Sequence, residues 1–260
     1  MSSLPHPTRY SGRLARKGVL VEETYRVFAH WDLGLSLREN ISRIRATNPI
    51  GATNQAWLRE VTATLSNRFS SGDPVGPLVT LAKGGLPMDT WKFCLLWHLG
   101  STDGLYADFA TGFLFPKLEQ EVAVFTTDDV LPFVHDLVDR DAFGQPLSEY
   151  GVRRLARDLL RMACEFGLLR GTSRREVAHP AIPDDAILYA LHDLQGAASS
   201  VHQIMDSARW RLFLLGPAQV EQDVLHLHQF RRLHYQRAGS IRELSLPHAN
   251  LMAFAQALVA

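Results

Sequence analysis

Four arginines on one predicted helix are the chemically most suggestive feature of this sequence. Arg153, Arg157 and Arg161 are spaced four residues apart, and Arg154 follows the first of them. Side chains spaced four apart lie on one face of an α-helix. A guanidinium group offers paired donors that match the oxygens of a phosphate group. The spacing therefore predicts a helix face that contacts the phosphates or a groove of a nucleic acid.

The opposite face of the same helix is apolar, which would hold the arginines outward. Ser148 and Glu149 open the helix, and Gly167 ends it. Apolar residues recur between these ends with the 3.6-residue period of a buried stripe. They are Val152, Leu155, Ala156, Leu159, Leu160, Ala163 and Cys164.

Basic residues continue directly after this helix. A short hairpin is predicted around Gly171–Ser173, and it carries Arg174 and Arg175. A shorter helix, from Thr127 or Asp129 to Val138, precedes the arginine-bearing one. Helix, turn, amphipathic helix and basic hairpin is the order of a winged helix-turn-helix, so we expect the last two arginines to lie on the wing.

A second basic helix is predicted nearer the start of the chain. Ser36 and Glu39 form a capping-box pattern that opens it. The helix carries Arg38, Arg43 and Arg45 on its outer side. These three arginines could extend the track of positive charge that begins on the first helix.

The distribution of charge supports this interpretation, although the formal net charge is zero. Residues 1–70 carry 10 basic and 5 acidic residues, and residues 148–175 carry 7 and 3. Residues 101–147 carry 2 and 9, so we expect this stretch to face away from DNA or to meet a basic partner. Two simpler explanations stay open. A GC-rich genome favours arginine over lysine, and an ordinary solvated helix would form the ion pairs Arg154–Asp158 and Arg161–Glu165.

Other chemistry finds little support in the sequence. His226, His228 and His234 lack a cysteine or an i+4 partner, so polar surface positions are a better explanation than a metal site. His135–Asp136 and His192–Asp193 resemble the dipeptide of metal phosphohydrolases, but the other ligands of such a site are missing. A phosphate loop with lysine, G-x-S-x-G and H-E-x-x-H are all absent. We therefore predict no catalytic residues, no metal and no cofactor.

Length and composition are those of an ordinary globular protein. The 260 residues are 46% hydrophobic and 21% charged, which excludes disordered and fibrous classes. Cys94 and Cys164 fall in apolar helical stretches and are predicted to be buried thiols. No apolar run approaches the length that spans a bilayer and no secretory signal is visible, so we expect a cytoplasmic protein with no membrane contact.

The expected fold is mainly α. A helical bundle is predicted over residues 12–125, a winged-helix-like segment over 126–180, and a C-terminal helical segment over 181–260. In the last segment, a second strand–turn–strand is predicted over 233–246, which makes a second wing possible. A final short helix is predicted over 250–258.

The order and character of these segments resemble the BrxA family, over roughly residues 10–250. Three stretches carry the resemblance: GVLVEET at 18–24, the segment 148–169 that ends in CEFGLL, and DDAILYAL at 184–191. BrxA is the small non-catalytic component of the BREX (bacteriophage exclusion) defence systems. The resemblance implies a helical core similar to the antitermination factor NusB, together with DNA binding. It also implies action beside a DNA methyltransferase, an ATPase and a phosphatase-like protein.

The sequence thus favours a non-catalytic component of a phage-defence assembly that binds double-stranded DNA with little sequence specificity. The alternative is a protein–protein adaptor of the same assembly whose arginines bind acidic partner surfaces without touching DNA.

Overall fold

The computed structural model describes residues 10, 17–69 and 74–260 of the chain. These residues form two compact units, each assembled from separate stretches. Unit 1 comprises the described residues of Met1–Val19 with Leu96–Ile182 and Met205–His226. Unit 2 comprises Leu20–Leu95, Pro183–Ile204 and Leu227–Ala260. The predicted segment 126–180 falls wholly within unit 1, whereas the other two predicted segments contribute to both units.

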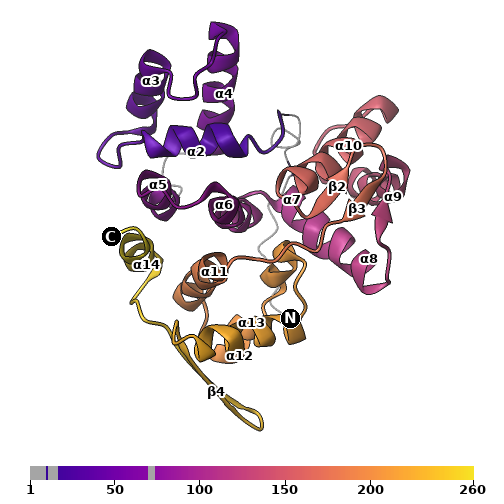
Figure 1. The fold of residues 1–260 in the computed structure, drawn as a ribbon. Helices are drawn as coiled ribbons and strands as arrows, with labels where there is room; N and C mark the ends of the chain where they lie inside the picture. Colours follow the sequence, from indigo (N-terminus) through magenta and orange to yellow (C-terminus); the bar gives the residue numbers. More distant parts are fainter. Residues whose placement is uncertain (1–9, 11–16, 70–73) are drawn as a thin grey trace. The chain divides into compact units, whose positions relative to one another are not determined.

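The described part of the chain is mainly helical with small antiparallel sheets, which confirms the predicted fold class (Figure 1). Three helices contain residues of both units: α6 (Met88–Thr102), α12 (Val201–Met205) and α13 (Pro217–Gln229). The other elements of unit 1 are α7 (Gly104–Asp108), the π-helix η1 (Phe109–Leu114), α8 (Phe115–Glu119), β1 (Val124–Phe125), α9 (Thr127–Asp139), α10 (Glu149–Glu165), β2 (Leu169–Gly171), β3 (Arg175–Val177) and the 3-10 helix η2 (Ala208–Phe213).

Aromatic side chains fill the core of unit 1. The ring of Phe113 lies 5.7 Å from that of Phe109 and 6.2 Å from that of Phe125 on β1. Around α6 and η2, the Trp97 and Trp210 rings lie 5.2 Å apart, and both indoles are buried. The short 3-10 helix η2 thus brings the aromatic side chain of Trp210 into this core.

The strands of a three-stranded antiparallel sheet come before and after the arginine-bearing helix along the chain. Its order is β1-β3-β2, with Phe125 opposite Arg175 and Gly171 opposite Arg175 on the other side. β1 precedes α9, and β2 and β3 follow α10. The hairpin of β2 and β3 was predicted, whereas β1 was not, because a two-residue strand has too few residues to show an alternating pattern.

Gly171 is the residue that permits the turn of this hairpin. Its φ is +108°, and a Cβ atom there would lie 2.3 Å from the carbonyl oxygen of Arg174. We expect Gly171→Ala to lower the free energy of unfolding by about 1–3 kcal/mol, because the left-handed backbone and the clash with main chain add strain. Urea denaturation measures this loss. Gly112→Ala is the matched control, because a Cβ atom meets nothing within 4 Å there, and it should not lower stability.

Unit 2 packs its helices around a second aromatic core. Its remaining elements are α2 (Val21–Ala29), α3 (Leu37–Thr47), α4 (Gln55–Arg68), α5 (Gly76–Lys83), α11 (Asp184–Ala197), β4 (His234–Ala238), β5 (Ile241–Ser245) and α14 (Leu251–Leu258). Phe28 lies 4.9 Å from Phe69 and 6.1 Å from Trp91 between ring centroids. The Trp91 indole also donates to the carbonyl oxygen of Leu78, which satisfies its buried N–H.

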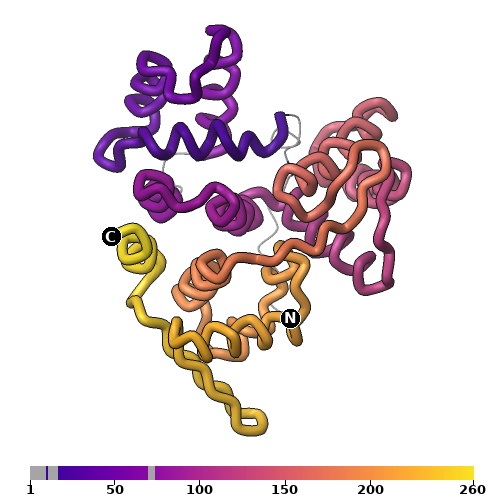
Figure 2. Tube along the Cα trace, in the orientation of Figure 1, coloured from indigo at the N-terminus to yellow at the C-terminus, as the bar shows by residue number. Residues whose placement is uncertain are grey.

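The C-terminal part of unit 2 contains the second predicted hairpin. β4 and β5 pair antiparallel and run out from the helices of this unit as a narrow hairpin (Figure 2). The buried side chain of Tyr235 anchors the end of the hairpin that joins the rest of the unit, whereas Ile241 near the turn is 64% exposed. The predicted final helix is α14, and Asn250 caps it by accepting from the backbone N–H of Ala253.

His192 is buried in unit 2 and lies flat against Phe254, with ring centroids 4.5 Å apart. Its Nδ1 lies 2.7 Å from the carbonyl oxygen of Leu188. Burial lowers the pKa of His192 below its ordinary value, and the nearby charge of His248 acts in the same direction. The ring therefore serves packing in its neutral form.

We expect this histidine to make stability fall in mild acid. In the unfolded chain the ring takes up a proton near pH 6.5, whereas the folded protein resists protonation at that pH. The free energy of unfolding is therefore highest above about pH 6.5 and declines as the pH falls below it. Urea denaturation at several values between pH 7.5 and about 5 measures the slope. His192→Leu should flatten it, and an unchanged slope in that variant would refute the assignment.

Candidate nucleic-acid interface

Helix α10 is fixed at its start and along one face. The Ser148 hydroxyl accepts a hydrogen bond from the Gly151 backbone N–H at 3.2 Å, which caps the helix as predicted. Helix α9 packs against α10. The predicted stripe from Val152 to Ala163 is buried, and Met162 and Asp158 join it. Cys164, at the end of the stripe, is only half-buried, so the prediction of two buried thiols holds for Cys94 alone.

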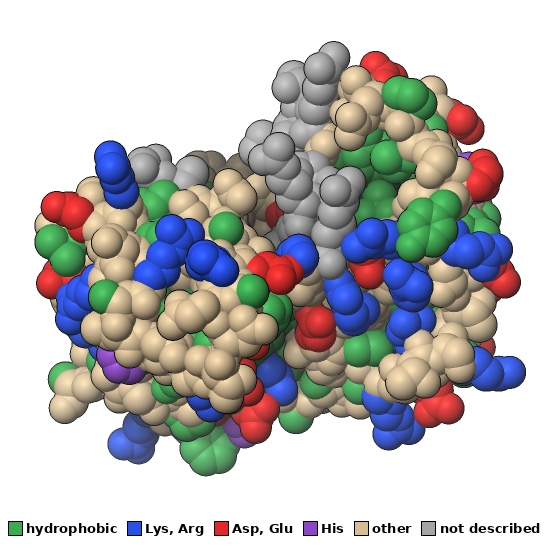
Figure 3. Space-filling view, turned by 90° about the horizontal axis from the view of Figure 1, so that it is seen from above, with side chains coloured by type: hydrophobic (Ala, Val, Ile, Leu, Met, Phe, Trp, Pro, Cys, Tyr) green, Lys and Arg blue, Asp and Glu red, His purple; other side chains and the backbone are tan. Residues whose placement is uncertain are grey.

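The opposite face of α10 presents the arginines to solvent. Figure 3 shows Lys and Arg side chains gathered over the part of the surface that contains α10, at the right of that view, with a few acidic side chains among them. Arg157 is exposed and forms no hydrogen bond or salt bridge among the described residues, although its charge acts on the buried Asp158. Arg153 is 61% exposed and pairs with Asp128 of α9 at 2.8 Å. These two side chains are the most available members of the row.

The other two arginines of the row share a buried carboxylate. Asp158 is 3% exposed and lies 3.7 Å from Arg154 Nε and 3.4 Å from Arg161 Nη2. Burial raises the pKa of Asp158 above its ordinary value, although the surrounding arginines oppose the shift. Arg161 also lies 3.6 Å from Glu165, so both ion pairs that the sequence suggested are present. Asp158 and Glu165 therefore reduce the net positive charge around Arg154 and Arg161.

The hairpin after α10 exposes Arg174 at its turn and buries Arg175. Arg175 is 7% exposed, which corrects the prediction that it lies on the surface of the wing. Successive residues of a strand point to opposite faces, so Arg175 shares the inward face with Val177, whereas Glu176 points outward. Burial raises the pKa of the half-buried Cys164 thiol, and the positive charge of Arg175 opposes that rise. The role of Arg175 in this structure is packing rather than surface contact.

Two exposed residues beside the row were not predicted. Arg170 on β2 is exposed and pairs with Glu176 across the hairpin at 3.2 Å. Tyr150, in the first turn of α10, is 73% exposed. The exposure of both residues can be inferred from the sequence. Arg170 alternates with the apolar Leu169, and Tyr150 falls outside the apolar stripe of the helix.

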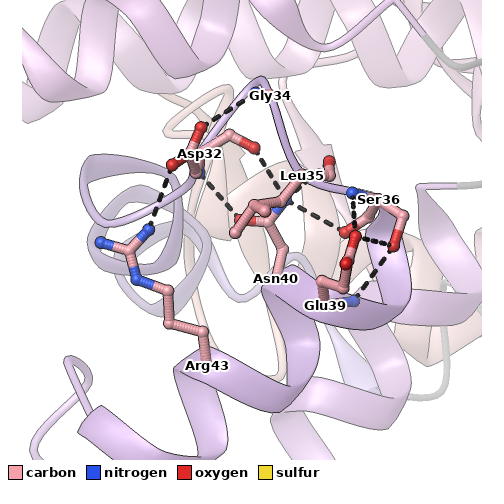
Figure 4. A network of polar contacts seen from close by, with 7 residues as sticks. All are labelled: Asp32, Gly34, Leu35, Ser36, Glu39, Asn40 and Arg43. Atoms are coloured by element: carbon pink, nitrogen blue, oxygen red, sulfur yellow. Dashed lines mark hydrogen bonds and ion pairs between the residues drawn. The ribbon is translucent and has the colours of Figure 1, made fainter.

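The basic helix α3 lies in unit 2. Its predicted capping box is present, with the Glu39 backbone N–H donating to Ser36 and the Glu39 carboxylate accepting from the Ser36 backbone (Figure 4). Arg43 lies 3.6 Å from Asp32, which Asn40 holds by accepting from its backbone N–H (Figure 4). Arg38 and Arg45 are exposed on the same helix. A continuous track from these arginines to α10 would join two units and stays a prediction.

A model of the BrxA family matches residues 8–192, which is more than half of the chain. This chain belongs to the BrxA family. Membership in BrxA implies a component of a BREX defence system, as the resemblance predicted. The match contains α3, α10 and the β2–β3 hairpin and ends within α11, so the second hairpin and α14 lie outside the BrxA match. No curated protein and no solved structure matches the chain.

The described residues of this BrxA chain offer no group of three or more His, Cys, Asp or Glu side chains that could hold a metal ion. The rings of His228 and His234 lie 5.3 Å apart, and His228 Nδ1 accepts from the Tyr235 backbone N–H at 3.3 Å. Within the same described part, no helix combines the length and the apolar character needed to cross a membrane.

Proposed function

We propose that this BrxA-family chain is a non-catalytic component of its BREX system that binds double-stranded DNA through unit 1. The observation that carries the proposal is the exposed arginine face of α10, whose other face is buried. The proposed contacts are Arg153, Arg154, Arg157 and Arg161 of α10, with Arg170 and Arg174 of the hairpin.

The order of elements around α10 supports this proposal. Helix α8, strand β1, the pair α9 and α10, and the hairpin of β2 and β3 follow one another, and the sheet order is β1-β3-β2. A winged helix-turn-helix has the same succession, with its second helix entering the major groove and its hairpin beside the backbone. In that arrangement the first turn of α10, where Tyr150 is exposed, would lie nearest the base edges.

Low sequence specificity is part of the proposal. The sequence of α10 contains no Asn or Gln, the residues that read adenine by paired hydrogen bonds, and we propose that its arginines contact phosphate rather than the edge of guanine. Arginine contacts to phosphate fix the position of a protein on DNA but do not distinguish sequences. Binding should therefore depend on salt more than on base order.

Fluorescence anisotropy with labelled duplexes tests the proposal. Two 20-bp duplexes of unrelated sequence should bind with Kd values within about threefold of each other. In about 0.1 M salt, affinities in the micromolar range are expected for contacts mainly to phosphate. Absence of binding to either duplex at 100 µM protein would refute the proposal.

A protein–protein adaptor is the second candidate, and the carboxylates near the row favour it. Asp128, Asp158 and Glu165 already neutralise part of the arginine charge, which lowers the attraction for DNA. Co-purification with the methyltransferase, ATPase or phosphatase-like protein of a BREX system, together with no duplex binding, would establish the adaptor in place of the DNA-binding function.

A further inference from the structure

Unit 2 contains an open groove between α3 and α4 that no part of the proposed function uses. Its volume is about 480 Å³, within the range of roughly 300–1,000 Å³ that small-ligand sites occupy. Six residues line it: Leu37, Arg38, Ile41, Ser42, Arg45 and Ser66.

Helical spacing brings the polar groups of this groove together. Arg38, Ser42 and Arg45 stand at positions i, i+4 and i+7 of α3, so they lie along one face of that helix. On α4, Thr62 and Ser66 are four residues apart and share the facing side. The groove therefore has a guanidinium group at each end of its α3 wall and hydroxyl groups on both walls.

The Arg45 side chain is held in place by a hydrogen bond to α4. Its Nε donates to the Thr62 hydroxyl at 2.8 Å. Thr62 is fully buried, and its own hydroxyl donates to the carbonyl oxygen of Leu58 at 2.8 Å. The Nε donor is thus taken up by a rigid partner, and the terminal nitrogens of Arg45 remain as donors for the groove. A guanidinium fixed in this way loses little freedom when it binds an anion.

No acidic side chain in the lining of the groove opposes the positive charge of its two arginines. None of the six lining residues is acidic. Over their whole lengths, α3 and α4 contain five arginines and two glutamates. One of the two, Glu39, is occupied by the capping box at Ser36. Two positively charged groups therefore share an open site with hydroxyl donors and without a carboxylate.

We propose that the α3–α4 groove binds a phosphate group. Two guanidinium groups and two serine hydroxyls offer more donors than the two oxygens of a carboxylate can accept, whereas a phosphate presents three or four oxygens around one centre. The apolar side chains of Leu37 and Ile41 form the remaining lining, against which the sugar or base of a nucleotide could lie. The phosphate could belong to a free nucleotide or to the backbone of a nucleic-acid strand.

This site shares no residue with the α10 interface, because all its residues lie in unit 2. The test uses the full chain carrying Arg153→Gln and Arg157→Gln, so that binding by unit 1 is suppressed. Inorganic phosphate, AMP, a 12-nucleotide single strand and sodium acetate are titrated at constant ionic strength. Chemical-shift changes at the Ser42 and Ser66 amides, followed by TROSY NMR, report binding in the groove.

The proposal predicts saturable shifts at both serines with phosphate and AMP, and at least tenfold weaker binding after Arg38→Gln/Arg45→Gln. Arg43→Gln is the matched control, since it removes one charge from the same helix outside the groove, and it should change Kd by less than twofold. If the oligonucleotide binds more tightly than AMP, the source is a nucleic-acid strand. If it does not, the source is a free phosphate ester.

Three results would overturn the proposal. The first is no saturable shift with phosphate or AMP. The second is equal affinity for acetate and phosphate, which would mean that the groove only attracts anions in general. The third is unchanged binding in the Arg38→Gln/Arg45→Gln variant. Failure of duplex binding by α10 would leave all of these measurements unaffected, so the two proposals fail separately.

Discussion

Replacing Arg153 and Arg157 together by glutamine is expected to weaken duplex DNA binding about 50-fold in 0.1 M salt. Both side chains are exposed on α10: Arg157 forms no salt bridge among the described residues, and Arg153 pairs only with the exposed Asp128. Each phosphate contact contributes about 0.9 units to the slope of log K against log salt. Two contacts therefore raise the binding constant by close to two orders of magnitude when the salt concentration falls from 1 M to 0.1 M. Anisotropy titrations with a 20-bp duplex measure the change.

A charge-matched control separates local contact from general attraction. Arg140 follows α9 in the same unit, is 61% exposed and pairs with Asp136 at 2.8 Å. Loss of its charge removes a similar surface ion pair away from α10, so Arg140→Gln should weaken binding by less than about threefold. Equal losses in Arg140→Gln and in either single variant of the row would show that only the overall charge of the unit matters.

The largest effect on stability is expected at the buried face of α10. Leu159 is fully buried in the stripe that fixes this helix. Leu159→Ala removes its apolar contacts and leaves a cavity, which should lower the free energy of unfolding by about 2–5 kcal/mol. Urea denaturation followed by circular dichroism measures the loss.

Leu225→Ala provides the same chemical change on the surface. Leu225 lies on α13, in the part of that helix that belongs to unit 1, and is 42% exposed. Its truncation should change stability by no more than about 0.5 kcal/mol. Similar losses for both variants would mean that the apolar stripe of α10 does not anchor the helix.

The sequence is most informative where a hydrophobic periodicity continues over many residues. The stripe of α10 repeats over more than three turns, so the helix, its Ser148 cap and its buried face are all predictable from the sequence. The capping box of α3 was equally clear, because two side chains three residues apart define it. The fold class followed from the sum of such helices.

Features that depend on neighbouring elements could not be predicted in the same way. β1 forms because Val124 and Phe125 meet β3, which is distant in sequence. The π-helical turn at Phe109–Leu114 has no sequence periodicity that would distinguish it from an α-helix of the same residues. The division of the chain into two units built from separate stretches likewise depends on tertiary contacts rather than on linkers.

The candidate site shows both limits. The row of arginines was predictable from spacing, but the burial of Asp158 between Arg154 and Arg161 was not, because charged residues are seldom fully buried. The inward direction of Arg175 was predictable in principle, since it alternates with Glu176 and shares a face with Val177. The basic side chain nevertheless favours an exposed position, because arginine is seldom fully buried.

The salt dependence of duplex binding, compared between the unaltered protein and Arg153→Gln/Arg157→Gln, shows whether the exposed arginines of α10 contact the DNA backbone. The slope of log K against log salt counts the phosphates that the protein neutralises. We expect the slope to be shallower by about two units in the double variant, with binding to unrelated sequences weakened equally. Identical slopes for the two proteins would contradict this expectation, because the exposed arginines of α10 would then not contact the DNA backbone.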